Sequence, residues 1–296
     1  MNMPFRGTAP ALVTPFTGGE IDHDAYHGLI DRQIAAGADA LVVLGTTGEN
    51  ATIWPDERRS LVDRAIGHVA GRVPVIVGTG NNSTSESIAF SKEAAASGAD
   101  GLLVVGPYYN KPTQKGFAAH VAAIADATDC PITLYNVPSR TSFNATAETI
   151  LGIARDVPTV VGVKEASGCL AQVSDILAHR DEDFAVYAGD DEMALPLLAL
   201  GADGVISVVS NVLPKQFGAL VCAGLAGEFR RAARMHFDLL PAMRACFQET
   251  NPVPTKTILA HLGLIEFGLR LPLVEMEDEN RRRVIAAFAP YIAAET

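Results

Sequence analysis

The stretch VVGVKEA, residues 160 to 166, is a short apolar run that is interrupted only near its end, by Lys164. Runs of this length and composition are typical of strands that are buried on both faces, as in parallel sheets. Similar runs recur along the first 210 residues, and a helix-like segment follows each of them. This alternation predicts a series of parallel βα units.

Eight such units can be counted, and they predict a (β/α)8 TIM barrel. Three of the helices end in a GAD sequence, at 37–39, 98–100 and 201–203, which fits a glycine helix stop and a short loop to the next strand. An open doubly wound sheet is the alternative, but its one dinucleotide-like string, GTGNNS at 78–83, lacks the third glycine. The expected strands are residues 9–16, 39–45, 73–80, 100–109, 131–137, 160–166, 184–190 and 204–210, and the helical segments between them include 55–70, 83–98 and 114–128.

The strand pattern stops after about residue 224. Residues 226–247, 254–264 and 278–293 have the composition of helices instead. We therefore expect a barrel over residues 1–224 that carries the active site, and a three-helix extension over residues 225–296 that forms a C-terminal helical layer.

Composition limits the classes of function. The chain has 296 residues, of which 48% are hydrophobic and 19% charged, as in soluble globular proteins. Its net charge of −11 disfavours nucleic acids and anionic membranes as partners. No apolar run is long enough for a membrane span and no signal sequence is recognisable, so a cytoplasmic location is expected. The four cysteines form no CxxC pair, which argues against a disulfide framework or a zinc site.

Lys164 is the first candidate for chemistry. The other five lysines lie in sequence surroundings that look polar or loop-like. A lysine in a buried strand must leave water, which disfavours the ammonium and favours the neutral, nucleophilic amine. Such an amine can form a Schiff base with a carbonyl substrate. The alternative is a structural lysine that reaches the surface or pairs with a carboxylate.

Polar side chains also stand at other strand ends, where barrel enzymes place their chemistry. Side chains alternate across a strand, so an inward Tyr135 leaves Leu134 facing the helices, and an inward Lys164 leaves Val163 and Glu165 outside the lumen. Taken singly, each polar residue could be an ordinary turn, packing or surface residue. Together at adjacent strand ends they indicate a site formed by Thr46, Thr47, Tyr108, Tyr109, Tyr135, Arg140 and Lys164.

No metal or cofactor is expected. None of the histidines lies in a strand core or in HxH or HExxH spacing. The acidic string GDDE at 189–192 could hold a divalent ion, but Asp190 or Asp191 is better explained as a helix cap. An acidic loop at this position also fits poorly with a phosphate site, so the expected substrate is an unphosphorylated carbonyl compound.

The ordered set of motifs resembles the dihydrodipicolinate synthase family. It comprises GTTGEN (45–50), GPYYNKP (106–112), YNVPSRT (135–141), GVKEASG (162–168), GDD (189–191), GVISV (204–208) and NPVPTK (251–256), and so covers nearly the whole chain. The resemblance implies the condensation of pyruvate with L-aspartate 4-semialdehyde to 4-hydroxy-tetrahydrodipicolinate, a step of lysine biosynthesis, usually in a homotetramer.

The resemblance also implies roles for individual residues. Lys164 would form the Schiff base with pyruvate, and Tyr135 would donate and accept protons. Thr46 would link Tyr135 to Tyr109, which the family contributes across a dimer interface. In addition, Thr47 and the main chain at Ile206 would hold the pyruvate carboxylate, and Arg140 would receive the carboxylate of the semialdehyde.

An allosteric site for L-lysine is a further implication of the resemblance. Asn82, Glu86 and Tyr108 match the groups that would hold the amino acid end of this effector. Lysine-sensitive relatives often carry histidines where this chain has Pro55 and Arg58. A guanidinium that faces the ε-ammonium of the effector is repulsive unless Arg58 swings into solvent, so weak inhibition or none is expected.

Three other functions stay open at this point. A related pyruvate-dependent aldolase, such as N-acetylneuraminate lyase or a sugar-acid lyase, would keep Lys164 and Tyr135 but would need a polar pocket for a long polyol. A non-catalytic barrel would be expected to have lost one of these two residues. A metal-dependent barrel hydrolase would need ligands that the histidine spacing does not provide.

Overall fold

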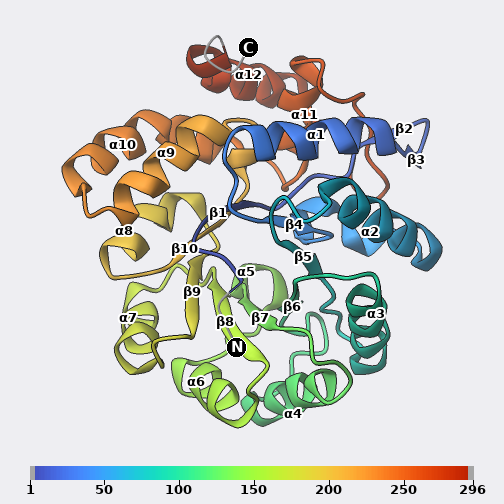
Figure 1. Cartoon of the computed structure of the whole chain (residues 1–296). Helices are drawn as coiled ribbons and strands as arrows, with labels where there is room; N and C mark the ends of the chain where they lie inside the picture. The colour runs from blue at the N-terminus through green and yellow to red at the C-terminus, as the bar shows by residue number, and fades with distance from the viewer. Residues whose placement is uncertain (1–3, 293–296) are drawn as a thin grey trace.

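The computed structural model describes residues 4–292, and its central feature is a sheet of eight parallel strands (Figure 1). The neighbouring strands run in the order β1-β10-β9-β8-β7-β6-β5-β4. A parallel bridge between Ala11 and Val42 joins the two ends of this order and closes the barrel. The strands are β1 (Gly7–Pro10), β4 (Leu41–Val43), β5 (Val75–Gly78), β6 (Gly101–Val105), β7 (Ile132–Asn136), β8 (Val160–Glu165), β9 (Ala185–Ala188) and β10 (Gly204–Ser207).

The expected (β/α)8 barrel is therefore confirmed, with differences at strand ends. The first strand occupies residues 7–10 rather than 9–16, because the chain leaves the sheet after the bridge at Ala11. Beyond it, the Val13 amide donates to Asn211 Oδ1 at 3.2 Å. The fourth strand ends at Val105 instead of residue 109, and Tyr109 lies in a loop with a φ of 70°.

Helices surround the barrel, and a short hairpin of β2 (Phe16–Thr17) and β3 (Glu20–Ile21) precedes the first of them (Figure 1). No helix of residues 4–292 is long and apolar enough to cross a membrane. The helices of the ring are α1 (His23–Ala35), α2 (Pro55–Val69), α3 (Thr84–Ala96), α4 (Gln114–Ala125), α6 (Ala147–Asp156), α7 (Leu170–His179), α8 (Ala194–Ala199) and α9 (Pro214–Leu225). The short helix α5 (Pro138–Thr141) follows β7 and lies inside this ring, over the barrel (Figure 1).

Three further helices form the C-terminal layer: α10 (Phe229–Ala245), α11 (Val253–His261) and α12 (Asp278–Ile292). Helix α10 packs on α8 and α9, and α12 packs on α10 and α11. Figure 1 shows α11 and α12 on the side of the barrel where α1 lies. The segment that leads into α11 contacts the loop after β4, because Asn251 donates a hydrogen bond to Thr47.

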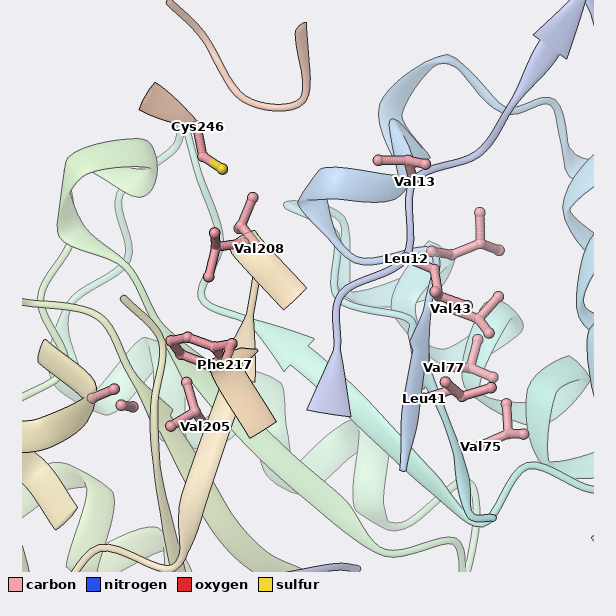
Figure 2. Close-up of a cluster of buried hydrophobic side chains, with 14 of the residues drawn as sticks. Leu12, Val13, Leu41, Val43, Val75, Val77, Val205, Val208, Phe217 and Cys246 are labelled. Atoms are coloured by element: carbon pink, nitrogen blue, oxygen red, sulfur yellow. The ribbon is translucent and has the colours of Figure 1, made fainter. Parts of the chain in front are cut away.

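Side chains that alternate along the strands divide the interior into two cores. Tyr135, Ile206 and Tyr187 belong to a cluster inside the barrel. A larger cluster between sheet and helices contains Leu134 and Val163, as the alternation predicts. Part of this outer cluster is drawn in Figure 2, where Leu41 and Val43 of β4 lie beside Val75 and Val77 of β5.

The three GAD sequences have two structural roles at the amino-terminal face of the barrel. Their glycines Gly37, Gly98 and Gly201 have φ values of 88°, 90° and 102°, so they end helices in a conformation that disfavours other residues. The aspartate that follows then accepts a backbone N–H from a neighbouring strand. These bonds are Thr8 N to Asp39, Val75 N to Asp100 and Val186 N to Asp203, each 2.8 Å long.

Candidate active site

A cavity of about 450 Å³ opens at the carboxyl ends of the strands, and five of the predicted residues line it. Its wall also includes residues from the C-terminal layer. The predicted residues are Thr46, Thr47, Tyr135, Arg140 and Lys164; the others include Ser139, Gly189, Asp190, Glu192, Val208, Arg244, Phe247 and Asn251.

Lys164 is the last inward-facing residue of β8, and its side chain is 95% buried. It lies opposite Tyr135 of β7 in the sheet register, and its Nζ is 4.2 Å from the centre of the Tyr135 ring. Gly189, at the end of the next strand, makes room for it. A Cβ at this position would lie 3.0 Å from Cγ and Cε of Lys164. The lysine is therefore held against the tyrosine, with its amine directed to the cavity.

A buried polar network fixes these two strand ends from the helix side. Glu165, next to Lys164, accepts hydrogen bonds from Asn136 Nδ2 at 3.0 Å and from Gln172 Nε2 of α7 at 3.0 Å. It also accepts the amide of Ser167 at 2.6 Å. Because Asn136 follows Tyr135, the network joins the ends of β7 and β8. We infer that it limits movement of the lysine relative to the tyrosine.

Thr46 and Thr47 lie in a short 3-10 helix, η1 (Thr46–Gly48), directly after β4. The Thr47 hydroxyl accepts a hydrogen bond from Asn251 Nδ2 at 2.9 Å. Arg140, in α5, donates from Nη2 to the main-chain oxygen of the same Asn251 at 3.4 Å. Asn251 thus bridges two residues that the sequence suggests for binding different carboxylates. No local pattern singles out Asn251, apart from its place in the NPVPTK motif.

Two acidic residues, Asp190 and Glu192, also line the cavity. Asp190 accepts the Glu192 amide at 3.0 Å and caps η3 (Asp191–Met193), as expected. Burial raises the pKa of Asp190, although the hydrogen bond from the Glu192 amide opposes that shift. Buried Asp191 accepts the amides of Val208 and Val209 at 3.1 and 2.7 Å, which fixes the turn after β10. Burial raises the pKa of Asp191 to about 6.

Three of the proposed site residues, Tyr108, Tyr109 and Ile206, do not line this cavity within the chain. Tyr109 is 90% exposed and lies in the loop after β6. Ile206 is fully buried inside the barrel, and Val208, two residues later, is the part of this segment that lines the cavity. The proton-transfer role of Tyr109 and the main-chain role of Ile206 stay predictions.

The four residues proposed for the effector site fall into two groups. The neighbours of Tyr108 include the Asn82 backbone and the Glu86 carboxylate, and burial raises the Tyr108 pKa. Arg58 of α2 is instead 96% buried, donates to the Gly78 carbonyl oxygen and lies 4.2 Å from the centre of the Phe90 ring. In this structure Arg58 therefore does not extend into solvent, and its place in an effector site stays a prediction.

One expectation about the lysines is also wrong. Lys256 looks like a polar helix residue in the sequence, yet its side chain is completely buried in α11 and pairs with Glu49. It lies outside the cavity, because the residues that line the cavity include no lysine other than Lys164. No periodic pattern predicts this contact, which joins residues 207 positions apart.

Comparisons with known proteins agree with this geometry. The model of the dihydrodipicolinate synthetase family matches residues 4–289. The 4-hydroxy-tetrahydrodipicolinate synthase of Salinibacter ruber is 61% identical over 97% of this chain and 96% of its own length.

Solved structures give the same result. The dihydrodipicolinate synthase of Thermotoga maritima is 44% identical, with a TM-score of 0.96 over 97% of this chain and 99% of that one. The enzyme of Cyanidioschyzon merolae with lysine bound is 39% identical, with a TM-score of 0.95 over 99% of both chains. On this evidence, the chain belongs to the dihydrodipicolinate synthetase family.

Proposed function

We propose that this chain is an enzyme that condenses pyruvate with L-aspartate 4-semialdehyde to 4-hydroxy-tetrahydrodipicolinate. The observation that carries the proposal is the buried Lys164 amine, 4.2 Å from the Tyr135 ring and directed into a cavity that also contains Arg140. A buried amine beside a proton carrier suits Schiff-base chemistry. The membership of the family supports the choice of reaction.

The chemistry follows from the residues in the cavity. The Lys164 amine attacks the carbonyl carbon of pyruvate, and the carbonyl oxygen leaves as water, which gives an imine. Loss of a methyl proton converts the imine to an enamine, whose carbon attacks the aldehyde. The amino group of the semialdehyde then attacks the imine carbon, which closes the ring and releases the Lys164 amine. Each step moves a proton, and Tyr135 is the sheet neighbour of Lys164 whose side chain lines the cavity and can carry that proton.

Binding groups for both substrates are present. The Thr47 hydroxyl would hold the pyruvate carboxylate, since Asn251 already fixes its position from the other side. Arg140 would receive the carboxylate of the semialdehyde, because its planar guanidinium can donate two parallel hydrogen bonds. No metal or cofactor is part of the proposed reaction.

The test of this function is a comparison of substrates with the purified chain. We expect condensation of pyruvate with L-aspartate 4-semialdehyde in an assay coupled to reduction of the product. With N-acetylneuraminate or a sugar acid, we expect no cleavage to pyruvate. Cleavage of either at a comparable kcat/KM would assign the chain to the other aldolases of this kind.

Arg140→Ala should weaken binding of the semialdehyde much more than binding of pyruvate. Loss of a charged, bidentate contact costs about 2 to 3 kcal/mol, or roughly 30- to 150-fold in KM. Steady-state kinetics with each substrate varied in turn measures both values. If both KM values rose equally, Arg140 would have a different role from the one proposed.

The proposed enzyme acts in the cytoplasm, as a homotetramer in which Tyr109 of one subunit completes the site of another. The exposed position of Tyr109 in the loop after β6 supports this role, because its side chain can contact a second copy of the chain. We also propose residues 1–224 as the barrel unit and 225–296 as its helical extension. Sedimentation of the chain and of Tyr109→Phe would test the assembly.

L-Lysine should inhibit this enzyme weakly or not at all. Phe90, against which Arg58 packs, lies one helical turn after Glu86 in α3, so the guanidinium stands close to the proposed effector site. Burial lowers the pKa of Arg58 to about 10, so the side chain is still charged at neutral pH. Like charges about 4 Å apart oppose each other by about 4 kcal/mol at an effective dielectric constant of about 20.

Initial rates in the presence of L-lysine measure this effect. Even about 1.4 kcal/mol of residual repulsion lowers affinity tenfold. Arg58→Met is the informative variant, because it keeps a long side chain and removes the charge, so it should increase sensitivity to lysine. Half-inhibition of the unaltered enzyme well below about 1 mM lysine would contradict the prediction.

A further inference from the structure

The pair formed by Glu49 and Lys256 is completely enclosed by protein. The Lys256 Nζ lies 2.6 Å from Glu49 Oε1, and the two side chains are 0% and 1% exposed. The same Nζ lies 4.2 Å from the centre of the Phe16 ring. Lys256 belongs to α11, whereas Glu49 lies between η1 and η2 (Asn50–Thr52) in the loop that follows β4. The pair therefore joins the C-terminal layer to a loop at the cavity.

Stability alone does not explain such a pair. Burial raises the pKa of Glu49 and lowers the pKa of Lys256, so it disfavours the charged form of both groups. The attraction between the carboxylate and the ammonium opposes both shifts. Replacing a buried ion pair by apolar residues of similar size is often neutral or stabilising, whereas removing one partner is strongly destabilising. A role other than stabilisation is therefore expected for Glu49 and Lys256.

The loop that Glu49 occupies is strained and carries the two threonines of the cavity. Leu44 and Glu49 have φ values of 56° and 55°, in the left-handed region that disfavours residues with a side chain. Strained backbone of this kind persists only where the surroundings enforce it, and it is common at functional sites. Thr46 and Thr47 lie between these two residues and line the cavity.

Three side-chain contacts hold consecutive residues of this loop. Asn251 Nδ2 donates to Thr47 Oγ1 at 2.9 Å, and Thr14 Oγ1 donates to the Gly48 main-chain oxygen at 2.8 Å. Lys256 then holds Glu49. Two of the three contacts come from the segment that leads into and forms α11, so the C-terminal layer restrains the threonine loop from behind.

We propose that the Glu49–Lys256 pair is a positioning device, through which the C-terminal layer holds Thr46 and Thr47 in the geometry that binds and activates pyruvate. The inference rests on the proposed function. Lys256 does not line the cavity, so it acts through Glu49 and the loop backbone rather than by touching the substrate.

The decisive experiment compares Lys256→Met with the double variant Glu49→Gln/Lys256→Met. The single variant leaves a buried carboxyl without its partner, so it should lose both stability and activity. The double variant contains no unpaired buried charge and should regain a thermal transition near that of the unaltered chain. Its kcat/KM for pyruvate should nevertheless stay about 10- to 100-fold low, because small displacements of a binding group have effects of this size.

Arg180→Met/Asp203→Asn is the matched control. Arg180 and Asp203 form a largely enclosed ion pair, with side chains that are 16% and 11% exposed. Asp203 precedes β10 and accepts the Val186 amide at the amino-terminal face of the barrel, away from the threonine loop and the cavity. We expect its removal to leave kcat/KM for pyruvate within about twofold of the unaltered value.

Two outcomes would overturn the proposal. The first is a stable Glu49→Gln/Lys256→Met double variant with unaltered kinetics, since the pair would then be structural only. The second is an equal loss of activity in the control.

Reductive trapping of pyruvate on Lys164 at low pyruvate concentration provides a second readout, because it needs no second substrate. If the chain traps pyruvate but fails to condense it with the semialdehyde, the proposed function is wrong, while trapping by the double variant still decides the role of the pair.

Discussion

In Lys164→Ala, borohydride reduction with pyruvate should leave no covalent adduct on the protein. Among residues 4–292, the cavity is lined by one lysine and two arginines, and a guanidinium cannot lose its proton near neutral pH to act as a nucleophile. Lys256 cannot substitute, because its side chain is completely buried against Glu49. Mass mapping of the digested protein measures the adduct directly.

Two variants make this result specific. Lys164→Arg keeps a positive charge at the same place and should also fail to trap pyruvate. Lys115→Ala removes an exposed lysine of α4 and should trap it normally. An adduct on any other lysine of Lys164→Ala, formed at the rate of the unaltered chain, would refute the assignment of the nucleophile.

Tyr135→Phe should lower turnover by about 10²- to 10⁴-fold, the usual contribution of general acid–base catalysis. The ring stays in place beside Lys164, so packing inside the barrel should change little and pyruvate should still be trapped, more slowly. Steady-state kcat and the single-turnover rate of imine formation measure the loss. Retention of near-normal kcat would show that another group moves the protons.

Tyr187→Phe is the control for this effect. Tyr187 is also a sheet neighbour of Lys164, and its hydroxyl donates to the Phe5 main-chain oxygen at 2.7 Å, away from the cavity. Its loss leaves a buried acceptor unpaired, which costs about 1 to 3 kcal/mol of stability. We therefore expect a lower thermal midpoint in Tyr187→Phe, with kcat close to the unaltered value.

The sequence was a good guide to the barrel because each βα unit carries its own signals. An apolar run predicts the strand, and a Gly-Ala-Asp sequence predicts the turn from a helix into the next strand. Strand ends were less predictable. The apolar and aromatic run from 100 to 109 favours a strand throughout, but pairing stops at Val105, and Tyr109 belongs to an exposed loop.

The candidate site was predictable where its residues follow strands. Lys164, Tyr135, Thr46, Thr47 and Arg140 stand at or just after strand ends, and the barrel brings them to one cavity. Residues from the C-terminal layer were not predictable in this way. Asn251 and Arg244 reach the cavity, and Lys256 reaches the loop behind it, by packing between distant segments. Local periodicity contains no information about such contacts.

The pairing of β1 with β10 has a consequence for synthesis of the chain. β1 pairs with β10, so its hydrogen-bonding partner on that side is made almost 200 residues after it. At about 5 to 20 residues per second, the first strand waits roughly 10 to 40 s on the ribosome before the ring can close. During that time the backbone N–H and C=O groups on this side of β1 are unpaired and can pair with a wrong strand. Chaperones protect chains in this state. The first strand of the barrel to be translated is thus among the last to be fixed.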